Sequence, residues 1–97
     1  MHAKGICHRD IKAENIIVGD HGKLKIIDFG FSVQFQPEKG LGVFCGTSHY
    51  MAPEIIQKKR YNGMKADIWA LGVLCVYMLT SVFPFRGATE KDLFAKI

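Results

Sequence analysis

A short polar stretch near the start of the chain holds side chains that together could act on a phosphate group. Asp10, Lys12 and Asn15 follow one another closely there, between two apolar patches. A carboxylate can orient an attacking hydroxyl, an ammonium group can hold a phosphoryl group, and an amide oxygen is a hard ligand suited to Mg²⁺. Asp28, further along the chain, would add a second metal ligand if the fold brought it close.

A β-hairpin between these residues is the element that would bring them together. Residues 16–18 form a β-branched run, residues 19–22 are Gly-Asp-His-Gly, and residues 23–27 alternate in part between polar and apolar. Two such runs separated by a glycine-containing turn predict a pair of antiparallel strands. We therefore expect the start of the first strand to lie beside the end of the second.

The register of this hairpin decides how close the two candidate metal ligands come. A turn centred on residues 21–22 pairs Ile16 with Ile27, and one further step places Asn15 beside Asp28. Directly opposed residues have Cβ atoms roughly 5 Å apart, and a slip of one residue would still leave both side chains at the same end. An acid, a cation and two oxygen ligands would then share one place, which is the set that phosphoryl transfer requires.

Each of these residues also has a purely structural explanation when it is taken alone. Asp10 could cap a turn, Asn15 could form an Asx-turn, and Asp28 could end a strand. The functional interpretation therefore rests on the whole set at these spacings, and on no single member of it.

The rest of the chain predicts an α+β fold that is mainly helical, with one small hairpin. Residues 28–47 show no periodicity and are expected to be a long irregular loop of functional importance. Pro53 suits the first position of a short helix that continues over residues 54–58. Residues 65–80 are apolar on nearly all sides, which predicts a long buried helix. Thr89 is the expected start of a last helix.

The composition narrows the setting in which the chain works. Its 97 residues make at most one small domain, and the net charge of +4 includes one compact basic run at residues 58–60, expected to be a solvated helix end rather than a nucleic-acid surface. The apolar stretch 68–79 is shorter than the roughly 20 residues that span a bilayer, which favours a core helix. Cys7, Cys45 and Cys75 match no disulfide or zinc pattern, so we expect packing roles in a reducing, intracellular and cytoplasmic compartment.

Four motifs in chain order resemble the catalytic half of the serine/threonine protein kinases. Residues 8–15 (His-Arg-Asp-Ile-Lys-Ala-Glu-Asn) resemble the catalytic loop of that family. Residues 28–30 (Asp-Phe-Gly) and 52–54 (Ala-Pro-Glu) match two further motifs, and residues 67–72 (Asp-Ile-Trp-Ala-Leu-Gly) resemble the buried helix that follows them. The resemblance covers the whole chain and is specific because all four motifs keep the family's order and spacing.

The resemblance implies a role for each residue that matches a family motif. Asp10 is implied to be the catalytic base, Lys12 to contact the γ-phosphate of ATP, and Thr47 to belong to the same catalytic set. Asn15 and Asp28 are implied to bind Mg²⁺. The residues implied to face the Mg·ATP cofactor are Lys12, Glu14, Asn15, Ile17 and Asp28, with Ile17 lining the adenine pocket.

Other matching residues imply how the site is supported and regulated. His8 and Phe29 match an internal hydrophobic spine, and Asp67 matches a buried acid that hydrogen-bonds the backbone of the catalytic loop, although an acid near a helix N-terminus also has a simple dipole explanation. Arg9 matches a residue that holds a phosphate on the activation loop, the irregular segment predicted above. Glu14 matches an acid that meets an arginine upstream of the target serine, and a solvated loop acid explains it equally well.

The identity of two residues bears on the substrate. Lys12 and Thr47 point to serine/threonine rather than tyrosine specificity within the family. Residues 44–47 (Phe-Cys-Gly-Thr) and 85–97 resemble the calmodulin-dependent or AMP-activated-like branches, or the cyclic-nucleotide-dependent branch. The implied partners are ATP and a protein substrate that carries Ser or Thr with basic residues upstream, and neither nucleic acid nor a membrane.

The sequence departs from those branches in its activation loop. A phosphorylatable Thr usually precedes the Cys of Phe-Cys-Gly by two residues, and here that position is Val43. Ser32 is the one hydroxyl side chain between Asp28 and Cys45, so the usual phosphate partner of Arg9 is missing. We therefore predict that activity does not depend on a phosphate at this usual site, position 43.

A second departure concerns how much of the family's domain is written in residues 1–97. The chain matches a lower-lobe fragment, from the catalytic loop to the start of a late helix, without the Gly-rich loop, the ATP-contacting strand lysine or the last helices. We expect negligible activity from these residues alone, since ATP must be enclosed by the Gly-rich loop and strand lysine as well as by the catalytic loop. A partner-binding kinase lobe without catalysis, or an incomplete reading of a longer gene, are the alternatives.

Overall fold

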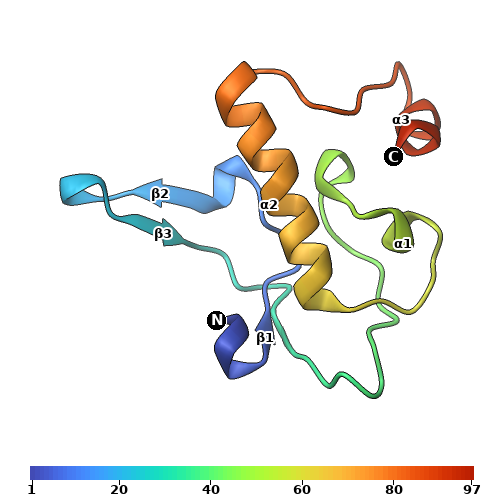
Figure 1. Cartoon of the computed structure of the whole chain (residues 1–97), viewed down its shortest axis with the longest axis horizontal. Coiled ribbons are helices and arrows are strands. Elements are labelled where there is room, and N and C mark those ends of the chain that lie inside the picture. The colour runs from blue at the N-terminus through green and yellow to red at the C-terminus, as the bar shows by residue number, and fades with distance from the viewer.

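A single long helix, α2 (Gly63–Thr80), forms the axis around which the rest of the chain is arranged. The computed structural model describes all residues from Met1 to Ile97. The molecule is flattened, with extents of 40 × 35 × 18 Å. A hairpin projects from one side of α2, while α1 (Pro53–Ile56) and α3 (Glu90–Lys96) lie on the other side (Figure 1). The three helices and two small antiparallel sheets agree with the predicted α+β class.

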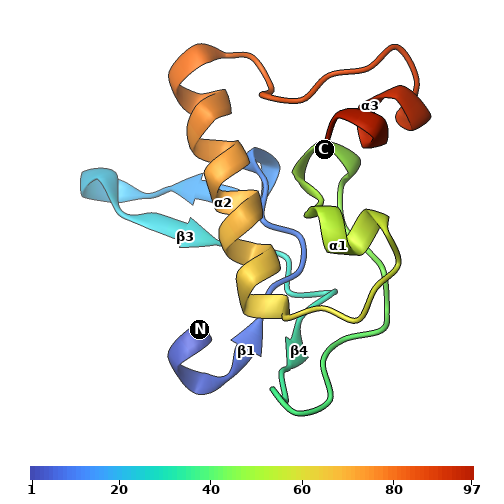
Figure 2. The same ribbon diagram turned by 45° about the vertical axis from the view of Figure 1, so that its right-hand side comes forward.

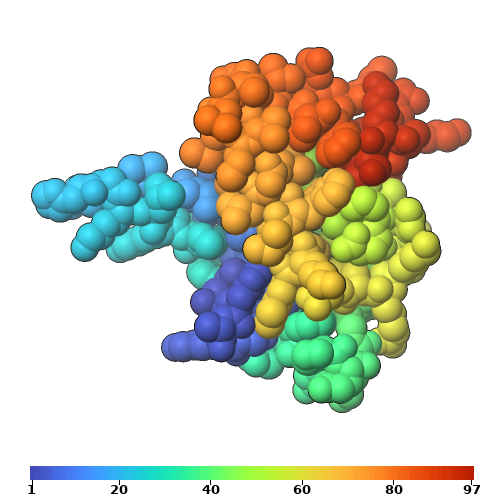
Figure 3. Space-filling model, viewed as in Figure 1, coloured from blue at the N-terminus to red at the C-terminus, as the bar shows by residue number.

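The predicted hairpin is present as β2 (Ile16–Val18) and β3 (Leu24–Ile26), and it stands clear of the body (Figure 3). Its register is one residue away from our prediction, because Ile16 pairs with Ile26 and not with Ile27. The cause is a symmetric loop centred on His21, which takes a left-handed conformation with φ of 59°. Asn15 consequently faces Ile27, whose N–H donates to the Asn15 carbonyl at 2.9 Å.

A second antiparallel pair was not predicted and lies where the sequence indicated only a loop. β1 (Ile6–Cys7) pairs with β4 (Val33–Gln34), as Figure 2 shows. Two residues are too few to produce a visible alternation, so no sequence pattern could have revealed these strands. The pairing ties the start of residues 28–47 to the segment that leads into the catalytic loop.

The helix boundaries follow from capping residues. α2 begins at Gly63, because the Asn62 side chain accepts hydrogen bonds from the N–H groups of Met64 and Lys65, so the helix starts two residues before our prediction. The Thr89 hydroxyl caps α3 in the same way, by accepting from the N–H of Asp92 at 3.1 Å. α1 starts at Pro53 as predicted, but it ends at Ile56 rather than at residue 58. Single 3₁₀ turns cover His2–Lys4, Ala13–Asn15, Asp20–Gly22 and Ser48–Tyr50.

Gly63 marks the point where three segments meet. It is buried, and a Cβ atom at this position would lie 2.7 Å from both the Sγ atom of Cys7 and the Cδ1 atom of Leu41. Carbon atoms do not approach other heavy atoms this closely without repulsion, so the close packing requires glycine.

Only one face of α2 is buried, which corrects the prediction of a helix buried on nearly all sides. Two small clusters pack on that face: Ile11, Tyr50, Ala70, Val73 and Leu74 form one, and Ala52, Ile55, Tyr61 and Ala66 form the other. On the opposite face, Ile68 is 58% exposed and Leu79 is 86% exposed. By length and composition α2 could cross a membrane, and a helix from a protein core meets the same two criteria.

The three cysteines are free thiols in three different environments. Cys7 is fully buried, Cys45 is half-buried, and Cys75 is exposed on α2, so the predicted packing role does not hold for Cys75. Burial raises the pKa of the Cys7 thiol to about 11, and the nearby Asp67 carboxylate adds to this effect. Cys7 is therefore a protonated, unreactive thiol at neutral pH.

Candidate active site

The catalytic-loop motif is fixed to α2 by one buried carboxylate. Asp67 is only 4% exposed, and its two oxygens accept hydrogen bonds from the backbone N–H groups of His8 and Arg9, each at 2.8 Å. Arg9 has a left-handed backbone with φ of 68°, a conformation that costs energy in a residue with a side chain. The two hydrogen bonds offset that cost and hold the turn. The predicted bonding of Asp67 to the loop backbone is thus confirmed.

His8 joins the catalytic loop to the end of strand β3. Its imidazole is fully buried, with Nε2 at 2.9 Å from the Ile27 carbonyl and Nδ1 at 3.1 Å from the N–H of Asp10. A carbonyl can only accept and an amide N–H can only donate, so the proton is on Nε2. The ring also packs edge-on against Phe29, with 5.1 Å between centroids. The two residues predicted to belong to an internal hydrophobic spine are therefore in contact.

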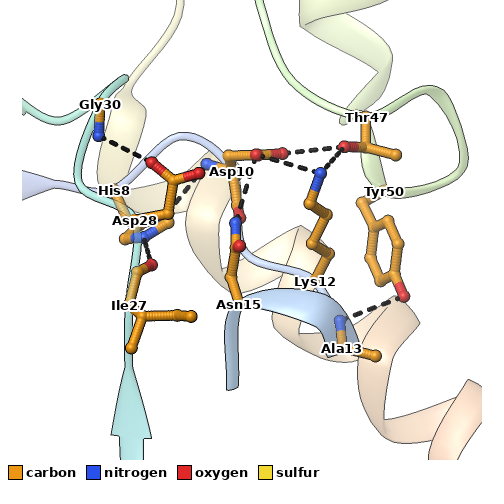
Figure 4. A network of polar contacts seen from close by, with 10 residues as sticks. All are labelled: His8, Asp10, Lys12, Ala13, Asn15, Ile27, Asp28, Gly30, Thr47 and Tyr50. Atoms are coloured by element: carbon orange, nitrogen blue, oxygen red, sulfur yellow. Dashed lines mark hydrogen bonds and ion pairs between the residues drawn. The ribbon is translucent and has the colours of Figure 1, made fainter. Parts of the chain in front are cut away.

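The Asp10 carboxylate is the centre of a polar cluster (Figure 4). The hydroxyl of Thr47 donates to Asp10 Oδ1 at 2.9 Å, and Lys12 Nζ lies 3.3 Å from Asp10 Oδ2. Lys12 Nζ also donates to the Thr47 hydroxyl at 3.0 Å, which closes a triangle of three side chains. Asn15 Nδ2 donates to the Asp10 carbonyl at 2.8 Å and approaches Oδ2 at 3.3 Å. Asp10 is therefore held in one orientation from several sides.

Thr47 reaches this cluster because the residue before it is glycine. Gly46 has φ of 127°, and a Cβ atom there would lie 3.3 Å from the carbonyl oxygen of Arg9. The backbone of the activation loop can thus pass close to the catalytic loop. Residues that are far apart in the sequence, Asp10 and Thr47, are brought into direct contact by this close approach.

The two predicted metal ligands lie at the open end of the hairpin. The Asn15 amide uses its nitrogen to bond Asp10, which leaves its oxygen free to coordinate a cation. Asp28 follows Ile27, the partner of Asn15, and is exposed with φ of 58°. One of its oxygens accepts from the N–H of Gly30 at 3.2 Å, and the other has no protein partner. Both residues thus keep a hard oxygen available.

The other two predicted cofactor residues lie apart from this cluster. Glu14 is exposed on the 3₁₀ turn Ala13–Asn15 and makes no side-chain hydrogen bond or ion pair. Ile17 is 47% exposed on β2. No group of three or more His, Cys, Asp or Glu side chains is placed to hold a metal ion by itself. A cation at Asn15 and Asp28 would need further oxygen ligands from phosphate or water.

Tyr50 is a supporting residue that sequence reasoning missed. It is 5% exposed, and its hydroxyl accepts from the N–H of Ala13 at 3.4 Å, next to Lys12. Burial raises the pKa of Tyr50 above its ordinary value, while the Ala13 hydrogen bond acts in the opposite direction. No local sequence pattern marks this role, because its partner lies 37 residues earlier in the chain.

Comparison with known proteins identifies the class to which this site belongs. Residues 1–97 match the protein kinase domain family, and the chain is a member of that family. It is 48% identical over 93 residues to the serine/threonine-protein kinase kin-29 of Caenorhabditis briggsae, covering 96% of this chain and 11% of that protein. It is 45% identical over 96 residues to sperm motility kinase Z of Mus musculus, covering 99% and 19%. It is 42% identical over 99 residues to CBL-interacting serine/threonine-protein kinase 15 of Arabidopsis thaliana, covering 99% and 24%.

The chain thus spans less than a quarter of the length of these curated relatives.

Proposed function

We propose that this chain supplies the catalytic loop and the metal ligands of a serine/threonine protein kinase. The kinase transfers a phosphoryl group from Mg·ATP to Ser or Thr hydroxyls of proteins. The observation that carries the proposal is the triangle of Asp10, Lys12 and Thr47, with separations of 2.9, 3.0 and 3.3 Å. An oriented carboxylate beside a fixed cation suits a reaction in which a hydroxyl attacks a phosphate.

Asp10 orients the substrate hydroxyl and accepts its proton as the new bond to phosphorus forms. Its backbone is held by His8 and its side chain by Thr47 and Asn15, so the carboxylate needs little reorganisation during the reaction. Lys12 holds the transferred group through its ammonium charge. Because Thr47 accepts from Lys12 and donates to Asp10, it keeps the acid and the cation at a fixed separation.

The donor set at the hairpin end fits a magnesium ion and ATP. Asn15 and Asp28 would hold the ion through hard oxygens, and the bound ion would neutralise charge on the phosphates. Ile17, which is 47% exposed, would supply an apolar surface beneath the adenine. Glu14 has an unpaired carboxylate that would attract an arginine of the substrate or remain solvated.

The proposed substrate is a protein with basic residues upstream of the target hydroxyl, and the proposed setting is the cytoplasm. Residues 44–47 and 85–97 favour a kinase of the calmodulin-dependent, AMP-activated-like or cyclic-nucleotide-dependent branches. The basic residues at 58–60 follow α1 and are all exposed, which suits a solvated helix end, and no nucleic-acid or membrane partner is part of the proposed role.

Phosphate transfer from labelled ATP to a basic, serine-containing peptide tests the proposal in the full-length protein. Asp10→Asn keeps the shape of the side chain and removes the base, so the rate should fall on the order of 10³-fold. Asp20→Asn, on the exposed hairpin loop, is the matched control and should keep the wild-type rate. Equal rates in Asp10→Asn and the wild type would refute the assignment. The 97 residues alone should show negligible transfer.

A partner-binding role without catalysis is the second candidate, and the exposed face of α2 favours it. Met78 is 67% exposed and Leu79 is 86% exposed, and a groove of about 310 Å³ lies between α2 and Pro84–Phe85. Exposed apolar surface of this kind commonly binds another protein surface. The same assay separates the two candidates, because a purely binding role predicts no Asp10-dependent transfer by the full-length wild-type protein.

A further inference from the structure

The five residues that precede Thr47 are almost untethered. Residues 42–46 belong to no helix or strand, and none of them takes part in a backbone–backbone hydrogen bond. One hydrogen bond reaches this stretch, donated by the Tyr61 hydroxyl to the Val43 carbonyl at 2.8 Å. A segment that carries an active-site residue at its end thus makes one hydrogen bond, to a single side chain from elsewhere in the chain.

Tyr61 is well suited to be a fixed anchor. It is only 4% exposed and packs in the cluster of Ala52, Ile55 and Ala66. Its backbone exchanges two hydrogen bonds with Leu41, at 2.8 and 3.1 Å, immediately before the untethered stretch. The ring of Phe44 lies against the ring of Tyr61, with 6.3 Å between their centroids.

Val43 lies four residues before Thr47, so the position of the Val43 backbone affects the position of Thr47. At the far end Gly46 passes under the Arg9 carbonyl, and the Thr47 hydroxyl bridges Lys12 and Asp10. We propose that Tyr61 is a positioning residue, whose hydroxyl tethers residues 42–46 and thereby holds Thr47 against Asp10. The catalytic part of this inference rests on the proposed kinase function.

The stretch itself cannot replace the tether. Residues 42–46 are Gly-Val-Phe-Cys-Gly and contain no hydroxyl, amide or charged side chain. The Val43 side chain is 64% exposed, so water would solvate its carbonyl if the Tyr61 hydroxyl were removed. Loss of the tether therefore frees the stretch locally and leaves the core intact. Burial raises the pKa of Tyr61 above its ordinary value, with the Arg9 side chain acting in the opposite direction, so the hydroxyl remains a donor at neutral pH.

The three cysteines provide the test, because each reports on a different part of the structure. Tyr61→Phe removes only the hydroxyl, and Tyr77→Phe is the matched control, since the Tyr77 hydroxyl makes no protein hydrogen bond and its ring stacks on Phe83. The full-length protein is treated with iodoacetamide, and peptide mass spectrometry follows labelling at each cysteine. Cys45 should label about fivefold faster in Tyr61→Phe than in the wild type, which corresponds to the loss of one hydrogen bond.

Cys7 and Cys75 should label at wild-type rates in both variants, because Cys7 is buried in the core and Cys75 is already exposed. Faster labelling of Cys7 together with Cys45 would indicate general unfolding and would overturn the proposed local role. An unchanged rate at Cys45 would show that the hydroxyl does not tether the stretch.

The kinetic measurement uses the same variants. In Tyr61→Phe the kcat for peptide phosphorylation should fall about fivefold with an unchanged KM for ATP, because the placement of Thr47 is disturbed and none of the residues proposed to face ATP contacts Tyr61. Faster Cys45 labelling without a change in kcat would overturn the positioning role. If the wild type transfers no phosphate, the proposed function fails and takes the positioning role with it, whereas the labelling result still decides whether the tether exists.

Discussion

Two segments supply the polar side chains of this site, and they are held in very different ways. The catalytic loop, residues 8–15, is fixed by buried Asp67 and His8 through hydrogen bonds between 2.8 and 3.1 Å. The activation loop, residues 28–47, is held by the β1–β4 pair near its start, by the Leu41–Tyr61 bridge and by the contacts of Thr47, and between these last two points one side chain tethers it. Asp10, the proposed base, thus lies on a rigid segment, while Thr47 beside it lies on a segment that can be displaced at low cost.

The difference has a physical origin in burial. The catalytic loop is held through the Asp67 carboxylate, which is only 4% exposed, so its loss leaves the N–H groups of His8 and Arg9 without an acceptor in a site removed from water. The activation loop is largely exposed from Gly42 to Phe44, where water can replace a lost partner. The loss of one hydrogen bond should therefore destabilise the catalytic loop strongly and the activation loop only weakly.

Among changes that test the difference between the two segments, Asp67→Ala should have the largest effect, and it should act on stability. It leaves the N–H groups of His8 and Arg9 without acceptors and removes the support of the strained Arg9 backbone. We expect a loss of about 3 kcal/mol in the free energy of unfolding, measured by urea denaturation of the full-length protein. Asp20→Ala, an exposed acid on the hairpin loop, serves as the control. A loss below about 1 kcal/mol would mean that the loop holds its shape without Asp67.

Thr47→Val should have an intermediate effect, and on activity more than on stability. The substitution keeps the shape of the side chain and removes the hydroxyl that joins Lys12 to Asp10. We expect kcat for peptide phosphorylation to fall about tenfold, with the free energy of unfolding changed by less than about 1 kcal/mol. Retention of full kcat would show that the direct contact of Lys12 and Asp10 is sufficient.

Phosphatase treatment should have the smallest effect. Val43 and its neighbours offer no phosphorylatable side chain, and Arg9 already donates through Nε to the Phe31 carbonyl. The activity of the full-length protein should therefore be unchanged after treatment, and phosphopeptide mapping should find no phosphate on Ser32, the one hydroxyl residue between Phe29 and Gly46, whose hydroxyl oxygen is buried. A stoichiometric phosphate in this segment that activity requires would contradict the prediction.

The sequence predicted the parts of the site that depend on local chemistry. The grouping of Asp10, Lys12 and Asn15 and the nearby end of the hairpin at Asp28 followed from spacing and turn signals alone. The register was wrong by one residue because His21 adopts a left-handed conformation, which only a few per cent of non-glycine residues take, although His is enriched among them. The consequence is small, since Asn15 still lies next to the residue that precedes Asp28.

The features that sequence reasoning missed are those that tertiary contacts alone create. Tyr50 and Tyr61 act through hydroxyls that meet backbone groups 37 and 18 residues away. The exposed face of α2 has the same apolar composition as the buried face, so composition could not show that only one face is covered. The contact of β1 with β4 depends on pairing between strands too short to show a pattern.

Gly63 has a consequence for the mutational tolerance of this chain. Cys7 leads into the catalytic loop and Leu41 belongs to the activation loop, so both segments pack against the space that a side chain at position 63 would fill. A single added methyl group would push the rigid and the mobile halves of the site away from α2 at once. An inherited change at this codon, remote from every polar group of the cluster, should therefore be as harmful as the loss of a residue within it.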